Sequence, residues 1–573
     1  MYYHGSRIIH RRLSFAFDTA FSCWCTARST MYLLLCVTFL SIGGTLSEPP
    51  LAVVKEGTLR GTYMKTLGGK EIAAFLGVPY AAPPVRFQSP SPPRKWEGIR
   101  NATEPKSDCL HYTELGLYVL GSEDCLYAYV YAPKDFNETK TLKDVIIYIH
   151  GGGFSCMLGH YGPRYILDHD VVYVFFTYRL GPLGFLSTGD TVIPGNFGLK
   201  DQNMLLKWVS HNIKAFGGNS NSVTLTGTSA GGASVHYHML SPMSKGLIHR
   251  AFSMSGTVLD PWTKTENFKE RASKLAQLLN CPSANSTEFH DCLMKKEGQE
   301  IVSKMKDFHT WIYYPFTVFG PVVEVEHPDA FISKPPIEII KNKEAQEVPW
   351  FTTLTSEEGL YPVADFIANK TALKYLDDHW NEIAPSLLDY GHLFEEYVSN
   401  EISRKIRNEY FGNGSILKNE KALIDVCSDR HFVLGTVDAA KLHAKYYKSP
   451  VYSYLFSYRG KNSVSGYVSK SNNNWGVCHA DDTGYMFHNE MINTEEIAND
   501  RKMIAVMTRV LVNFAKNGAP QMDDNLLWPE VDDVEDTFTY VNIKNHTYNI
   551  LERNSLLGRP NFWDLLGFKK KEI

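Results

Sequence analysis

Ser229 lies between two glycines in "GTSAG" (227–231), where the strand-like run "SVTLTG" (222–227) passes into a helix-like run. A serine hydroxyl attacks a carbonyl carbon when a base removes its proton and donors hold the oxyanion. The G-x-S-x-G pattern indicates such a nucleophile only between a strand and a helix, and that is its context here. Gly227 and Gly231 are expected where side chains would collide in the tight turn. A purely structural glycine turn is the alternative.

The run "HGGGF" (150–154) follows the apolar stretch 144–149 and precedes the serine in the chain. Consecutive glycines let backbone N–H groups turn toward one point without a side chain in the way. We therefore predict an oxyanion hole made by the N–H groups of Gly152, Gly153 and Ala230. A flexible loop with no chemical role is the alternative.

A base and an acid follow later in the chain. His479 lies in "GVCHADD" (476–482), and Glu357 and Glu358 lie in "SEEG" at the end of an apolar run. The order serine, acid, histidine is that of the α/β-hydrolase triad. The chain has 20 histidines, so any single one is more often structural. The residues alone leave open which of the two glutamates would meet the imidazole.

These side chains need a rigid scaffold, and the chain alternates apolar strand-like runs with helix-like runs. Further strands are expected at 144–154, 171–180, 249–256, 348–359 and 451–458, and helices at 201–218 and 504–518. Asp201 is expected to favour the start of the first helix and Gly217 to end it. The alternation predicts an α/β fold with a mostly parallel sheet covered by helices on both faces. Residues 48–573 show no composition break, which predicts one large domain.

The N-terminal segment has the pattern of a targeting signal. An apolar stretch, 32–42, follows Met31 and leads to small residues and prolines, which predicts a signal peptide over 31–47. Residues 1–30 would be an upstream extension of uncertain status, and an uncleaved membrane anchor is the alternative. We expect a secreted, extracellular protein without a stable membrane anchor. The net charge of −4 and the lack of a long basic run exclude nucleic acid as a partner.

Secretion permits glycans and disulfides. Six N-x-S/T sequons occur, at Asn101, Asn137, Asn285, Asn369, Asn413 and Asn545. Seven cysteines lie outside the leader, and short-range pairing is favoured for Cys109 with Cys125 and for Cys281 with Cys292. Cys156, Cys427 and Cys478 remain, and an odd number implies at least one free thiol or an intermolecular bond.

Many ordered motifs together make the sequence similar to the type-B carboxylesterase (carboxylesterase/cholinesterase) family, and in particular to insect secreted esterases such as venom carboxylesterases. Besides those already quoted they include "GVPYAAPPVRF" (77–87), "SEDCLYAYVYAP" (122–133), "YRLGPLGFLSTGD" (178–190), "GNFGLKDQ" (195–202) and "FGPVVE" (319–324). The resemblance implies a serine hydrolase of small esters that needs no cofactor or metal. It implies that Ser229 is the nucleophile, that His479 is the base, and that Glu358 orients His479. It also implies the three oxyanion donors and both disulfides named above. Two structural ion pairs are implied as well, Arg86 with Glu123 and Arg179 with Asp201.

The sequence departs from the family at Thr228, because most members have a glutamate before the nucleophile. The loop between Cys109 and Cys125 also lacks the tryptophan that holds choline in cholinesterases. Both features favour neutral esters. A juvenile hormone esterase is one alternative, since Gly476, His479 and Asp482 keep its G-x-x-H-x-x-D spacing, although its usual glutamine is replaced by Thr228. A catalytically weak binding or adhesion ectodomain is the other.

Overall fold

The computed structural model describes residues 48–113, 118–522, 528–534, 537–547, 549–555 and 557–568. The predicted signal peptide and upstream extension, residues 1–47, lie outside the described residues. No helix within the described ranges combines the length and apolarity that a bilayer span requires.

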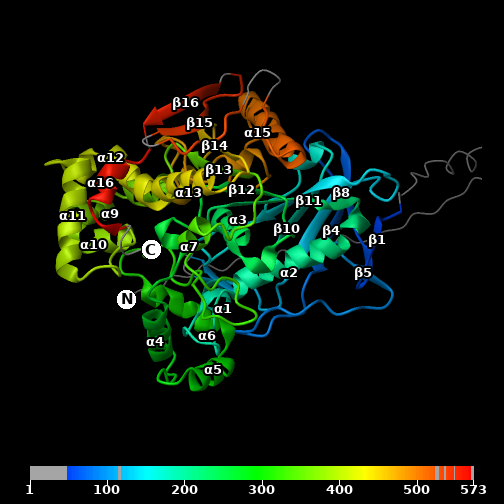
Figure 1. The fold of residues 1–573 in the computed structure, drawn as a ribbon, viewed down its shortest axis with the longest axis horizontal. Coiled ribbons are helices and arrows are strands. Elements are labelled where there is room, and N and C mark those ends of the chain that lie inside the picture. The colour runs from blue at the N-terminus through cyan, green and yellow to red at the C-terminus, as the bar shows by residue number, and fades with distance from the viewer. Residues whose placement is uncertain are drawn as a thin grey trace, which may run out of the picture. The chain divides into compact units, whose positions relative to one another are not determined.

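An eleven-stranded sheet forms the centre of the fold (Figure 1). Strands β10, β9, β11, β12, β13, β14 and β15 pair in parallel in that order, and antiparallel strands extend both edges. The mostly parallel α/β-hydrolase sheet predicted from the sequence is thereby confirmed. Its strands are β3 (Thr62–Lys65), β4 (Glu71–Pro79), β8 (Tyr127–Pro133), β9 (Lys143–Ile149), β10 (Val172–Phe176), β11 (Gly218–Thr228), β12 (Arg250–Met254), β13 (Trp350–Thr355), β14 (Val451–Phe456), β15 (Thr537–Ile543) and β16 (Asn549–Ser555).

Helices cover both faces of this sheet. Trp350 and Phe351 are consecutive on β13 and therefore point to opposite faces. The Phe351 ring packs 5.5 Å from Phe514 of α15 (Ala498–Asn517), measured between ring centroids. The Trp350 ring packs 4.5 Å from His236 of α3 (Ala230–Leu240) and 4.8 Å from His443 of α13 (Leu434–Tyr446). Burial from both sides explains why the central strands read as continuous apolar runs.

The helix expected at 201–218 differs at its start. Helix α2 spans Phe197–Asn212 and begins after Asn196, which has a left-handed backbone (φ 57°). The expectation that Asp201 favours the helix start is therefore wrong. Asp201 lies beyond the first turn, fully buried, and binds the Arg179 guanidinium at 2.7 and 2.8 Å. Gly217 does end the segment, with φ 74°, after a 3-10 turn.

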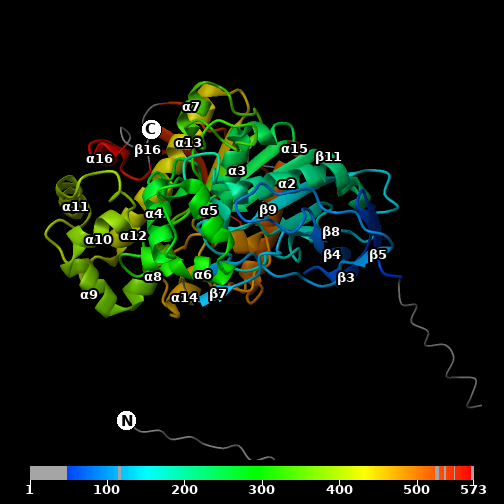
Figure 2. The same ribbon diagram turned by 90° about the horizontal axis from the view of Figure 1, so that it is seen from below.

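The remaining elements lie around this core. Helices α9, α10, α11 and α12 gather at one end, and β1, β4, β5 and β8 lie at the opposite end (Figures 1 and 2). The bounds are β1 (Leu51–Val54), β2 (Gly57–Arg60), β5 (Ile99–Asn101), β6 (His111–Thr113), β7 (Tyr118–Leu120), α1 (Gly181–Phe185), α4 (Phe268–Leu278), α5 (Ser286–Met294), α6 (Gly298–Ser303), α7 (Pro336–Lys341), α8 (Leu360–Ala368), α9 (Lys370–Asp378), α10 (Trp380–Leu387), α11 (Glu396–Phe411), α12 (Glu420–Ser428), α14 (Val464–Ser469) and α16 (Pro560–Asp564).

Two disulfides close short loops of the chain. They join Cys109 to Cys125 and Cys281 to Cys292, the two pairs predicted from the sequence. Within the described residues, Cys427 and Cys478 are buried free thiols.

Candidate active site

The turn between β11 and α3 carries Ser229 in a strained conformation, with φ 61° and ψ −124°. The backbone around it is crowded. A Cβ atom on Gly231 would lie 2.0 Å from the Ile149 carbonyl oxygen, and one on Gly227 would lie 2.6 Å from the Gly231 carbonyl. The structure therefore shows the collision that the two flanking glycines avoid.

The glycine loop after β9 packs directly against this turn. A Cβ atom on Gly151 would lie 2.9 Å from the Cβ of Ser229. Gly152 and Gly153 both have positive φ, 114° and 58°, which favours glycine. Among the described residues, the N–H groups of Gly152, Gly153 and Ala230 donate to no protein acceptor. Gly152 lines the same cavity as Ser229, Ala230 follows Ser229 directly in the chain, and Gly153 is next to Gly152.

The structure brings His479 together with Glu358. The Nδ1 atom of His479 lies 2.6 Å from Oε2 of Glu358. The other oxygen of this fully buried carboxylate accepts hydrogen bonds from the Ser255 hydroxyl (2.6 Å) and the Thr355 N–H (2.7 Å). The carboxylate is therefore fixed from two neighbouring strand ends, β12 and β13.

Glu357, the other candidate acid, binds elsewhere. Its Oε2 accepts hydrogen bonds from the Val477 N–H (2.7 Å) and the Ser356 hydroxyl (2.5 Å). Its own N–H donates to the Val477 carbonyl at 3.0 Å. Glu357 therefore holds the loop that carries His479, whereas Glu358 contacts the imidazole itself.

Aromatic side chains hold the imidazole ring of His479. The ring centroid of Phe432 lies 4.4 Å away and that of Tyr361 5.6 Å away. Phe432 belongs to a π-helical turn, Asp429–Val433, a rare geometry that is frequent at functional sites. The sequence indicates neither ring, because no local pattern marks a contact between residues so far apart in the chain. Ser255 also escaped notice, although its place at the end of an apolar strand was a usable signal.

Ser229 and His479 line one small cavity of about 20 Å³. The Nε2 atom of His479 is buried and has no hydrogen-bond partner among the described residues. The other lining residues include no carboxylate, lysine or arginine; they are Gly151, Gly152, Leu158, Tyr161, Thr228, Tyr361, Val464, Ala480 and Met491. Nε2 of His479, without a partner among the described residues, therefore belongs to the same uncharged cavity lining as Ser229.

Thr228 joins a hydroxyl network behind the serine. Its hydroxyl lies 2.7 Å from that of Thr483. The carboxyl of Asp482 follows, held by the Tyr454 hydroxyl (2.7 Å) and the Thr483 N–H (2.8 Å). Burial raises the pKa of Asp482 to about 6. Thr228 thus keeps a carboxylate out of the cavity lining, while a buried carboxyl remains behind it.

A mostly parallel sheet with helices on both faces and a serine on a strained strand–helix turn is characteristic of the α/β hydrolases, and this chain is one of them. Residues 48–563 match the model of the carboxylesterase family, to which the chain therefore belongs. It is a carboxylic-ester hydrolase.

Three similar proteins extend this result. Venom carboxylesterase-6 of Apis mellifera is 40% identical over 552 residues, covering 95% of this chain and 99% of that protein. A juvenile hormone esterase of Tribolium castaneum is 32% identical over 550 residues, covering 90% and 93%. The crystal structure of juvenile hormone esterase from Manduca sexta, with OTFP covalently attached, matches with a TM-score of 0.79 at 27% identity, covering 92% and 99%.

Proposed function

We propose that this protein is a serine carboxylesterase that hydrolyses neutral carboxylic esters through an acyl-enzyme on Ser229. The observation that carries the proposal is the pair His479 Nδ1–Glu358 Oε2 at 2.6 Å, with His479 Nε2 unpaired among the described residues in the cavity it shares with Ser229. An imidazole held in this way accepts a proton at Nε2 and keeps one at Nδ1.

The reaction has two halves. In the first, Nε2 of His479 takes the hydroxyl proton as Ser229 Oγ attacks the ester carbonyl carbon, and the oxyanion binds the N–H groups of Gly152, Gly153 and Ala230. The alcohol then leaves with the proton from His479. In the second half, the same histidine activates water, which releases the acid and restores Ser229. Glu358 stabilises the imidazolium in both halves.

The direct test is pre-steady-state hydrolysis of 4-nitrophenyl acetate. We expect a burst of nitrophenol equal to the enzyme concentration, and no burst with Ser229→Ala. Loss of the nucleophile should lower kcat by about 10⁴–10⁶-fold. Ser107→Ala, at an exposed serine, is the matched control and should keep the full burst. A folded Ser229→Ala enzyme with an undiminished burst would refute the proposal.

The uncharged cavity lining supports a preference for neutral esters over esters of cationic alcohols. We expect naphthyl acetate to be turned over far faster than acetylcholine, and comparable rates would contradict this preference.

Juvenile hormone esterase activity is the second candidate, favoured by the two relatives of that name and by the spacing of Gly476, His479 and Asp482. Selective hydrolysis of juvenile hormone at submicromolar KM would establish it. The paired His479 and Glu358 favour catalysis over an adhesion ectodomain.

Secretion as a glycoprotein is the last part of the proposal. Two disulfides support it, as does the exposure of five sequon asparagines: Asn101, Asn137, Asn285, Asn369 and Asn413. Asn545 is half-buried. We expect protein secreted from insect cells to start near residue 48 and to lose mass on treatment with peptide N-glycosidase. A secreted protein that retains residue 31 would contradict the proposed signal cleavage, and an unchanged mass would contradict the proposed glycosylation.

A further inference from the structure

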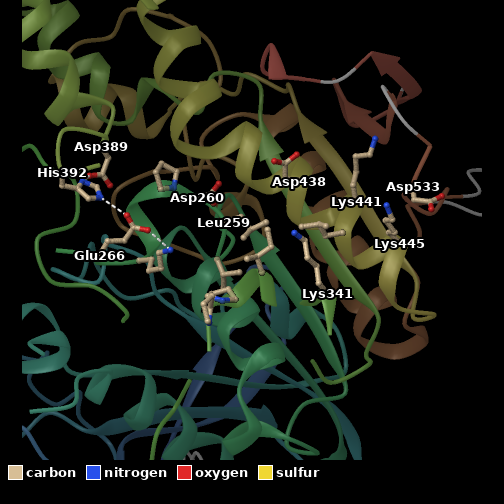
Figure 3. Close-up of a pocket in the computed structure, with 17 residues that line it drawn as sticks. Leu259, Asp260, Glu266, Lys341, Asp389, His392, Asp438, Lys441, Lys445 and Asp533 are labelled. Carbon is tan, nitrogen blue, oxygen red and sulfur yellow. Dashed lines mark ion pairs between the residues drawn. The ribbon is translucent and has the colours of Figure 1, made fainter. Parts of the chain in front are cut away.

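A second and much larger cavity, of about 520 Å³, lies between the loop after β12 and helices α7 and α13 (Figure 3). It shares no lining residue with the small cavity that Ser229 and His479 line. Its size falls within the range of small-molecule sites. Apolar side chains contribute to its lining, among them Val258, Leu259, Pro336, Ile337 and Leu442, and we call this set the apolar floor. We call this space the α7–α13 cavity.

The charges at one end of the α7–α13 cavity are already compensated. Glu266 pairs with Lys264 at 2.7 Å and with His392 at 3.3 Å, and these pairs are drawn in Figure 3. His392 also lies 3.8 Å from Asp389. This end therefore has little net attraction for a charged ligand.

Three lysines stand at the opposite end, with two carboxylates (Figure 3). Lys341 ends α7, and Lys441 and Lys445 lie one turn apart on α13. Lys441 donates to two backbone carbonyls, at 2.7 and 3.0 Å. Neither Lys341 nor Lys445 forms an ion pair with any carboxylate in the described ranges. Together with Asp438 and Asp533, the described residues leave this end with unbalanced positive charge.

Asp260 lies in the wall of the cavity, where burial disfavours its charged form. One carboxyl oxygen accepts the Thr257 N–H at 2.7 Å, and the other is buried without a partner among the described residues. Burial raises the pKa of Asp260 well above its usual range. The apolar floor and the lysine end together define an amphipathic site.

We propose that the α7–α13 cavity binds a monocarboxylate with a long apolar chain, of the fatty-acid class. The chain lies on the floor formed by Leu259, Ile337 and Leu442, and the carboxylate lies at Lys341 and Lys445. The site goes beyond the proposed esterase function and does not depend on it, because no catalytic residue lines it.

The test is calorimetric titration of the whole protein with dodecanoate. We expect saturable binding at one site, weakened on the order of tenfold or more in the double variant Lys341→Glu/Lys445→Glu, because two attractions become repulsions. Lys343→Glu is the matched control, since Lys343 is exposed, near Lys341 in sequence and outside the cavity, and it should leave binding unchanged. Equal affinity in the double variant and the wild type would overturn the lysine site.

A chain-length series tests the apolar floor separately. From octanoate to dodecanoate the affinity should rise by up to about fourfold per added methylene, the factor expected for burying one CH₂ group. Leu442→Asp should abolish this rise, and Ile337→Ser serves the same purpose if the first variant fails to fold, as judged by its melting curve. A flat series in the wild type, or a rise that survives in a folded floor variant, would overturn the proposal.

Discussion

Replacing Glu358 by glutamine should disable His479 through its tautomer while leaving the fold intact. In the structure, the Ser255 hydroxyl and the Thr355 N–H both donate to Oε1. The glutamine oxygen must take the place of Oε1 to accept both hydrogen bonds. Its NH₂ group then takes the place of Oε2, which lies 2.6 Å from Nδ1 of His479 in the wild type. Two donors cannot face each other there. The imidazole must then carry its proton on Nε2, which can no longer accept the proton of Ser229.

The expected cost follows from that tautomer. A triad acid changed to its amide lowers kcat by about 10⁴-fold in a serine protease, with the geometry kept. We expect a loss of the same order here in saturating 4-nitrophenyl acetate, with KM changed little. The variant should still fold, with a modestly lowered melting temperature, because the glutamine oxygen keeps both hydrogen bonds at Oε1 but without the carboxylate charge.

Glu357→Gln is the matched control, since it makes the same chemical change one residue away. Glu357 binds the Val477 N–H rather than the imidazole. We expect kcat to remain within a few-fold of the wild type, while the free energy of unfolding falls by about 1–2 kcal/mol through the weakened charge-assisted hydrogen bond. Unchanged kcat in Glu358→Gln, combined with a large loss in Glu357→Gln, would refute the assignment of the acid.

Three further perturbations test the surrounding structure. In the folded state the pKa of Asp481 is about 7 and that of Asp482 is about 6, both above the unfolded value of about 3.9. The folded protein therefore keeps protons on these carboxyls that the unfolded chain releases as pH rises from about 4 to 7, so stability falls over that range. Urea unfolding should therefore show the wild type losing about 2–3 kcal/mol relative to Asp482→Asn over that range, and parallel curves would contradict the raised pKa. Gly231→Ala should prevent folding or abolish esterase activity, since its Cβ would meet the Ile149 carbonyl at 2.0 Å, and an active, stable variant would contradict the crowding. Cys109→Ser/Cys125→Ser should lower the unfolding free energy by about 3 kcal/mol for this 16-residue separation, measured by urea denaturation, and an unchanged midpoint would contradict the estimate.

The parts of the site that the sequence predicts are those encoded by short patterns. Gly227 and Gly231 mark the turn because only glycine fits so close to a neighbouring backbone, and that constraint is local. The central strands can also be predicted from the sequence, since burial on both faces requires an unbroken apolar run. The edge strands β3 and β16 cannot, because they expose part of their side chains and lack such a run.

What the sequence hides depends on contacts between distant segments. Local position makes Asp201 look like a helix-start residue, and only the family resemblance indicates its partner, Arg179, which lies on another segment and holds it in a buried ion pair. Glu357 and Glu358 are chemically identical and adjacent, so residue type alone cannot rank them. The family resemblance favours Glu358, and the positions of Val477 and His479 relative to the end of β13 give the two glutamates different partners.

The geometry also explains which part of the molecule can vary without disturbing the site. Ser229, Ser255 and Glu358 follow the ends of β11, β12 and β13, which are neighbouring parallel strands. Carboxyl ends of parallel strands meet at one edge of a sheet, so the register of three strands sets the distances among these side chains. Crowding locks this arrangement, because a Cβ on Gly256 would lie 2.2 Å from the Ser229 carbonyl. Helices α9, α10 and α11 lie at one end of the molecule (Figure 2), and none of their residues lines the cavity that Ser229 and His479 share. Sequence changes in those helices should therefore alter stability before they alter kcat.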